Sequence, residues 1–197
     1  MRRNGYGRPH PRPTVIRTWT RGAVGGALAY VAGYALTYAV AAGDVEDELA
    51  VLNFVLDVFG QDAVPTWTAV GWLAYNAVYV PLTYWNTSQN LLADASPLVH
   101  IVPGVLLALA GAGVAFTVNA TTPTAGARVG ATVALGFLPL VVVGVFVLTV
   151  TRGDLTIRPD PALAVAAGAL YPLVFGTLGG ALTGWFRGRA PQARPTN

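Results

Sequence analysis

The sequence predicts an all-α fold: a polytopic transmembrane helix bundle with five spans and one extracytoplasmic amphipathic helix. Hydrophobic residues make up 54% of the 197 residues and charged residues only 11%, whereas a soluble domain typically carries about 25% charged residues. Uncharged apolar runs long enough to cross a bilayer, about 20 residues each, recur along the chain. We expect the spans at residues 22–42, 65–85, 97–118, 129–150 and 162–186.

The segment before the first span, residues 1–21, is rich in arginine, proline and glycine and is expected to be a disordered tail. It holds six of the twelve basic residues of the chain. Because basic residues accumulate on the cytoplasmic side of membrane proteins, we expect a protein of the cell membrane with a cytoplasmic N-terminus. With five spans, Arg152 and Arg158 also lie inside, whereas Arg187 and Arg189 lie outside and oppose the rule.

Residues 44–64 form an acidic insert with six carboxylates and no basic residue. Asp44 suits a helix N-cap, and at about 100° per residue Leu49 and Leu56 share one face. The apolar stretch of residues 49–59 would be only about 16 Å long as a helix, which is too short to cross a membrane. We therefore expect an amphipathic helix on the extracytoplasmic surface.

The expected second span, residues 65–85, carries Asn76 near its centre and Tyr79 nearly one turn later. A buried amide needs hydrogen-bond partners, so these side chains are interpreted either as an interhelical polar contact or as the lining of a solute path. His100 near the start of the third span is the third candidate. A lone histidine there is more often an interfacial side chain than a ligand.

Small residues recur every four positions in two spans. This spacing favours close helix packing, because lipid offers no hydrophobic drive for helices to associate. In the fifth span these residues are Gly176, Gly180 and Gly184. In the first span they are Gly25, Ala29 and Gly33. We expect both series to lie at helix–helix contacts, and residues 187–197 to form a disordered tail.

Several activities lack the residues that they require. None of the five expected spans contains Asp, Glu, Lys or Arg, which argues against a proton-coupled pump. The chain has no cysteine, so disulfides and thiolate metal sites are excluded. Motifs for a catalytic triad, a phosphate-binding glycine loop or a zinc-binding helix are missing. We expect no enzymatic activity, no metal and no cofactor. A basic face with interleaved aromatic residues is also missing, so we expect no nucleic-acid partner.

The absence of lysine, the acidic insert and the pairs Gly71-Trp72 and Tyr75-Asn76 resemble a family of uncharacterised multi-pass membrane proteins from halophilic archaea. Some members of that family carry the label "transporter". The resemblance implies a membrane location and an outward-facing acidic insert, and it supplies no catalytic or binding residue.

Two functional hypotheses remain open. The first is transport of a small solute along a path lined by Asn76 and Tyr79. The second is a non-transporting structural or helper subunit that packs against another membrane protein. In either case the expected partners are the lipid bilayer and a second copy of the chain or another membrane protein.

Overall fold

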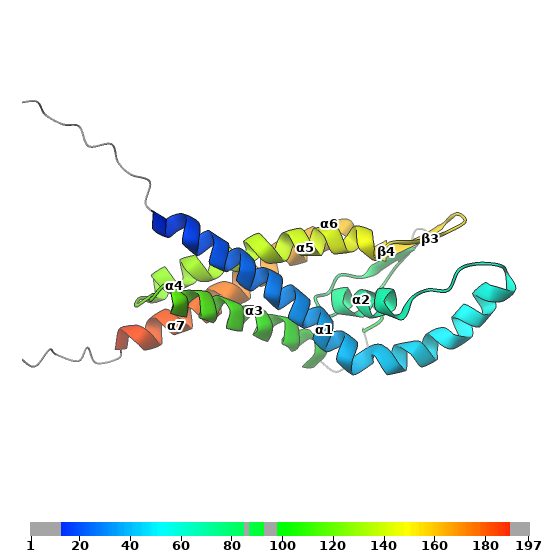
Figure 1. The fold of residues 1–197 in the computed structure, drawn as a ribbon, viewed down its shortest axis with the longest axis horizontal. Helices are drawn as coiled ribbons and strands as arrows, with labels where there is room; N and C mark the ends of the chain where they lie inside the picture. The colour runs from blue at the N-terminus through cyan, green and yellow to red at the C-terminus, as the bar shows by residue number, and fades with distance from the viewer. Residues whose placement is uncertain (1–12, 85–86, 93–97, 190–197) are drawn as a thin grey trace, which may run out of the picture.

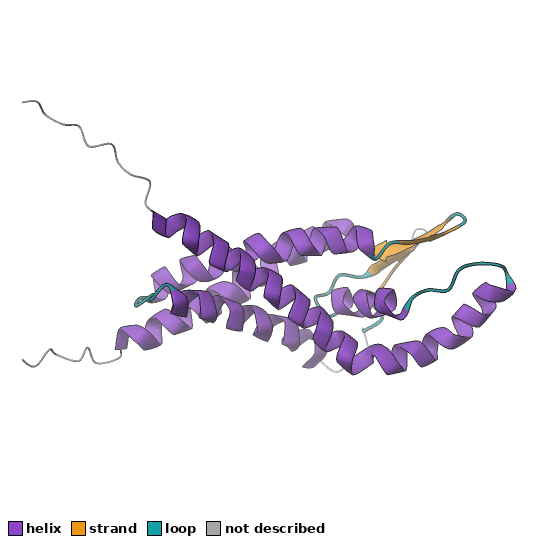
Figure 2. Cartoon of the chain, viewed as in Figure 1, coloured by secondary structure: helices purple, strands orange, loops and turns teal. Residues whose placement is uncertain are grey.

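The computed structural model describes residues 13–84, 87–92 and 98–189, which form five helices and one small sheet (Figures 1 and 2). The first three helices are α1 (Pro13–Val58), α2 (Thr66–Asn76) and α3 (Leu98–Thr117). The fourth is continuous through α4 (Pro123–Gly130), the 3₁₀ turn η1 (Ala131–Val133) and α5 (Ala134–Val147). The fifth is continuous through α6 (Pro161–Tyr171), the π-helical turn η2 (Pro172–Gly176) and α7 (Thr177–Arg189).

Four of these helices are long and apolar enough to cross a membrane: Ile16–Val58, Val99–Thr117, Pro123–Val147 and Pro161–Arg189. Four of the five expected apolar helices are therefore present. Pro139 and Pro172 lie inside their helices without ending them. The π-helical turn begins at Pro172, because a proline has no N–H to give to the preceding turn.

The expected span at residues 65–85 is wrong. α2 has 11 residues, about 16 Å of helix, and the chain then turns through Tyr79, whose φ is 60°, into strand β1 (Leu82–Tyr84). The apolar residues of this segment are buried within the protein, since Val70 and Val80 are almost fully inaccessible to solvent. Hydropathy cannot distinguish a segment surrounded by protein from one surrounded by lipid.

A four-stranded antiparallel sheet, which the all-α prediction missed, lies at the end of the bundle where α5 gives way to α6 (Figure 2). Its order is β2-β1-β4-β3, and it joins the segment after α2 to the hairpin before α6. The remaining strands are β2 (Thr87–Gln89), β3 (Val150–Arg152) and β4 (Leu155–Pro159). The pairing of Thr83 with Arg158 fixes where the chain returns after α2.

The expected separate helix at residues 44–64 is also wrong, because α1 continues without a break to Val58. At 46 residues α1 is about 69 Å long, and its acidic last third extends beyond the bundle (Figure 1). α1 begins at Pro13, so the expected disordered tail is helical from that residue on, while its residues 1–12 lie outside the described residues. The expected tail at residues 187–197 is helical up to Arg189, and the rest lies outside the described residues.

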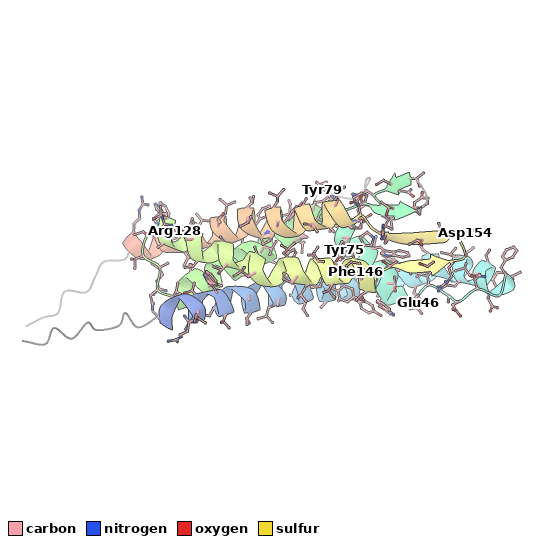
Figure 3. The ribbon with its side chains drawn as sticks, turned by 90° about the horizontal axis from the view of Figure 1, so that it is seen from above. Glu46, Tyr75, Tyr79, Arg128, Phe146 and Asp154 are labelled. Atoms are coloured by element: carbon pink, nitrogen blue, oxygen red, sulfur yellow. The ribbon has the colours of Figure 1, made fainter. Side chains whose placement is uncertain are left out.

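The four long helices bring the start of α1 and the end of α7 to the same end of the molecule, whereas five spans would have separated them (Figure 1). That arginine end carries Arg17, Arg21, Arg128, Arg187 and Arg189. Of the nine acidic residues, Asp94 lies outside the described residues, and the other eight all lie at the opposite, acidic end. Figure 3 shows the separation, with Arg128 at one end and Glu46 and Asp154 at the other.

Glycines hold the helices together at the arginine end. A methyl group added at Gly176, Gly180 or Gly184 would collide with backbone oxygens of the α4–η1 segment or of the loop before it. The partner glycines Gly126 and Gly130 also stand four apart, a signal that the sequence offered and that the prediction overlooked. α7 thus approaches its neighbour to backbone contact, as small residues permit.

The three small residues predicted to pack in the first span, Gly25, Ala29 and Gly33, do not make the closest helix contact. Gly25 faces Val114 of α3 at ordinary contact distance, Ala29 is buried, and Gly33 faces Leu106. The closest approaches of α1 lie at Gly22, Ala23 and Gly26, which press against η1 (Thr132 and Val133) and against α5 (Gly136 and Phe137). The spacing of four was therefore visible in the sequence, but the choice of face needed the neighbouring helix.

Candidate functional site

The structure contains an apolar pocket of about 320 Å³ between α1, α2, α3 and α5. Its mouth lies between α1 and α3, where the rim side chains Leu36, Val40 and Val102 are 45%, 75% and 39% exposed. These residues belong to the apolar faces of two helices long enough to cross a membrane. The pocket therefore opens sideways, toward the region that lipid chains would occupy.

Aromatic side chains form the inner wall. Tyr30 of α1 packs edge-on against Phe137 of α5, with ring centroids 5.8 Å apart. Tyr75 of α2, 4% exposed, completes this wall from the side of the acidic end (Figure 3).

The polar atoms of the wall have partners within the protein. The Tyr75 hydroxyl donates to the carbonyl oxygen of Val141, beside the Tyr30 phenol. Burial, reinforced by Tyr30, raises the pKa of Tyr75, so its hydroxyl stays protonated and keeps donating. Tyr34 donates to the carbonyl oxygen of Trp67 at 3.0 Å. A ligand therefore meets a surface that is mostly carbon.

α2 is the element that closes the pocket, and two contacts with α5 set its position. The indole nitrogen of buried Trp72 donates to the carbonyl oxygen of Leu148 at 2.8 Å. Gly71 lies against the side chain of Leu148, where any larger residue would collide. The tryptophan thus satisfies a free carbonyl at the C-terminal end of α5, and α2 is fixed across the end of the cavity.

The predicted site residue Asn76 is fully buried but does not line the pocket. Its amide nitrogen donates to the carbonyl oxygen of Val80 at 2.9 Å, and its amide oxygen accepts from the backbone N–H of Leu91. These bonds tie the turn after α2 to the segment that leads toward α3. The contact is local and structural, and it joins turn to loop, not one spanning helix to another.

The other two predicted site residues lie together. The rings of Tyr79 and His100 stack with centroids 4.2 Å apart and an interplanar angle of 12°. His100 Nδ1 lies 2.9 Å from the carbonyl oxygen of Ala77, so this nitrogen carries the proton and donates. The pair fastens the turn after α2 to α3 and does not line the pocket. The described residues contain no group of three His, Cys, Asp or Glu side chains placed to hold a metal ion.

Sequence reasoning missed the pocket because its walls consist of ordinary apolar residues drawn from four helices. The available signal was the pair Tyr30 and Tyr34, two phenols four residues apart inside an uncharged run. Their spacing places both on one helix face, but the sequence does not show which helices that face meets.

Comparison with known proteins gives one match. A family model described as "Family of unknown function (DUF7978)" matches residues 5–187, nearly the whole chain. Comparisons with curated proteins and with solved structures give no match.

Proposed function

The chain belongs to the DUF7978 family, whose function is unknown, and from this premise we propose that it is an integral membrane protein that binds an apolar or amphipathic molecule. The pocket between α1, α2, α3 and α5 is the observation that carries the proposal. Its volume of about 320 Å³ lies at the lower end of the range for small-molecule sites. Its sideways mouth gives access from the hydrocarbon without passage through water.

The lining favours a chain-like ligand without charge at the inserted end. Among the described residues, no Asp, Glu, Lys or Arg lines the pocket. A buried charge on the ligand would thus find no partner and would cost several kcal/mol or more. An acyl or isoprenoid chain fits these walls, with any polar head left at the mouth near the acidic end.

We propose a cytoplasmic arginine end, with both ends of the described chain on the inside of the cell membrane. Five described arginines lie at that end, and two, Arg152 and Arg158, lie at the acidic end. The positive-inside rule prefers this orientation. The four-helix arrangement also removes the conflict that Arg187 and Arg189 caused in a five-span count.

Binding is better supported than transport of a polar solute. Asn76, for which lining a solute path was one of two interpretations, uses its amide in hydrogen bonds with the backbone of Val80 and Leu91. A helper role gains no support from the α7 glycine ridge, because α4 already covers it. We further propose that the pocket performs no catalysis, since the hydroxyls of Tyr34 and Tyr75 donate to backbone carbonyl oxygens and no Asp, Glu, His or Lys among the described residues lines it.

Extraction of bound molecules from the purified protein tests this proposal. The wild-type chain, purified from membranes in mild detergent, should release a chain-bearing molecule detectable by mass spectrometry in near-stoichiometric amount. Ala74→Phe fills the pocket from α2 and should abolish that signal. Val143→Phe, on an exposed α5 position outside the pocket, should retain it. Equal amounts from the two variants would show that the molecule is bulk lipid and would refute the proposal.

A further inference from the structure

The last third of α1, residues 44–58, forms a helical arm with two different faces. One face packs against the protein: Val45 and Leu49 are buried, and Asn53 forms two hydrogen bonds with the backbone of Val64, at 2.8 and 3.2 Å. This bonding holds the arm in a defined position. The other face is exposed in the part of the chain that the structure describes.

The outward face combines an apolar ridge with carboxylates. Val51, Phe54, Val55 and Val58 are 71%, 70%, 44% and 66% exposed, and their spacing of three, one and three residues makes them one continuous stripe. The exposed acids Asp44, Asp47 and Glu48 precede Val51 by seven, four and three residues, so they continue the same stripe toward the membrane. We call these seven residues the acidic–apolar face. Exposed apolar patches of this kind mark interaction sites.

Lipid is a poor occupant for this face. The uncharged run of α1 ends at Gly43, and Val51 and Val58 lie about 12 and 22 Å further along the helix. The interfacial layer on each side of the hydrocarbon is only about 5–8 Å thick. α1 curves where it leaves the bundle, and its last third still advances along the long axis of the molecule (Figure 1), so the stripe lies beyond the headgroups.

A second copy of the chain is also a poor occupant, because its arm would bring the same charges. All eight described acidic residues lie at this end, against two arginines. One of these, Arg152, already donates to the carbonyl oxygens of Asp62 and Ala63 at 3.1 and 3.3 Å. Like charges face to face cost free energy and disfavour such an association.

We propose that the acidic–apolar face docks an amphipathic segment of another protein, one that presents apolar residues flanked by arginine or lysine. The stripe supplies the apolar anchors, as in helix recognition by an apolar surface. Asp44, Asp47 and Glu48 supply the opposite charge for the flanking cations and set the orientation. This surface is separate from the apolar pocket, and its occupancy does not depend on a ligand there.

Two synthetic helical peptides with the same leucine pattern test the proposal, one with arginine and one with glutamate at the flanking positions. The full chain is placed in zwitterionic nanodiscs, and binding is measured by fluorescence anisotropy with empty nanodiscs as background. The arginine peptide should bind wild type, bind Phe54→Asp at least about tenfold more weakly, and bind Gln61→Asp within twofold of wild type. Gln61 is an exposed residue after the end of α1 and outside the acidic–apolar face, so Gln61→Asp adds the same carboxylate elsewhere at this end of the molecule. Equal binding of both peptides, no binding of either, or no effect of Phe54→Asp would overturn it.

A photo-crosslinking amino acid at position 54, in native membranes, identifies the occupant directly. An adduct with a protein segment that carries arginine or lysine around apolar residues supports the proposal. An adduct with a second copy of this chain, an adduct with lipid, or no adduct at all overturns it.

Discussion

Gly126 of α4 and Gly180 of α7 lie so close that a methyl group on either would overlap the carbonyl oxygen of the other. One turn away, Gly130 and Gly176 repeat the arrangement. Association of helices in lipid depends on dispersion contacts, which fall off steeply with distance. The seam between α4 and α7 therefore stabilises the bundle because the two backbones approach closely. A side chain added at these glycines would prevent that approach.

Gly180→Ala should lower the melting temperature in detergent by several degrees, because overpacking costs about 1–3 kcal/mol. Gly113→Ala is the matched control: it adds the same methyl group to a helix at a position with no neighbour within 4 Å. This control should leave the melting temperature unchanged or raise it, because alanine has the higher helix propensity. Equal melting temperatures for the two variants would show that the seam between α4 and α7 tolerates an added methyl group.

Asn76→Ala should destabilise the protein without a specific effect on ligand binding. The substitution removes the partner of the buried Val80 carbonyl and the acceptor of the partly buried Leu91 N–H, at a cost of about 1–3 kcal/mol. Asn90→Ala, which removes a partly buried contact to Leu92 N, should cost less. Thermal unfolding with and without added lipid measures both effects. An undiminished melting temperature for Asn76→Ala would favour a role in a solute path.

Arg187→Ala should lower the free energy of unfolding by about 1 kcal/mol. The expected loss is small because the Arg187 side chain is partly exposed to solvent. The guanidinium donates to the Phe116 carbonyl oxygen and the Asn119 side chain, at 2.9 and 2.8 Å, and so caps the C-terminal end of α3. Arg187→Lys should recover only part of the loss, because an ammonium cannot reproduce the planar fork. Arg189→Ala, which removes an arginine stacked on Trp185, is the charge-matched control. Identical losses for both alanine variants would assign the effect to net charge.

Single introduced cysteines should report the topology without background labelling of other residues, because the chain contains no cysteine. In intact cells an impermeant maleimide should label Asp154→Cys, in the hairpin between β3 and β4. Thr124→Cys, at the start of α4, should be labelled only after the membrane is opened. Five spans with a cytoplasmic N-terminus predict the opposite pattern for both positions. Labelling of Thr124→Cys alone in intact cells would therefore refute the four-helix arrangement proposed here.

Hydropathy located most of the helices. The expected spans at residues 97–118, 129–150 and 162–186 overlap α3, α4–α5 and α6–α7, and residues 22–42 lie within α1. Asp160 caps α6 by accepting from the backbone N–H of Leu163 at 2.8 Å, and Pro161 follows at the first helical position. These features depend on local sequence, namely on apolar content and on side chains that reach their own backbone.

The candidate site was less predictable for a physical reason. The polar residues Asn76, Tyr79 and His100 attracted notice because polar groups in apolar runs are rare, and the structure uses them to fasten a turn. The pocket owes its existence to the spacing between helices, to which Ala74 and Phe137 contribute no distinctive signal. A cavity belongs to several helices together and has no motif in any one of them.

The sequence by itself determined the apolar character of the long helices, the glycine spacing and the acidic character of residues 44–62. Each of these follows from residue type and from a position along one helix. Only the tertiary structure decided that α2 stops inside the protein, that α1 runs on past the bundle and that the pocket opens sideways. The free energy of leaving water is similar for a side chain that enters lipid and for one that enters a protein core. Only the neighbours and hydrogen-bond partners found in three dimensions distinguish the two.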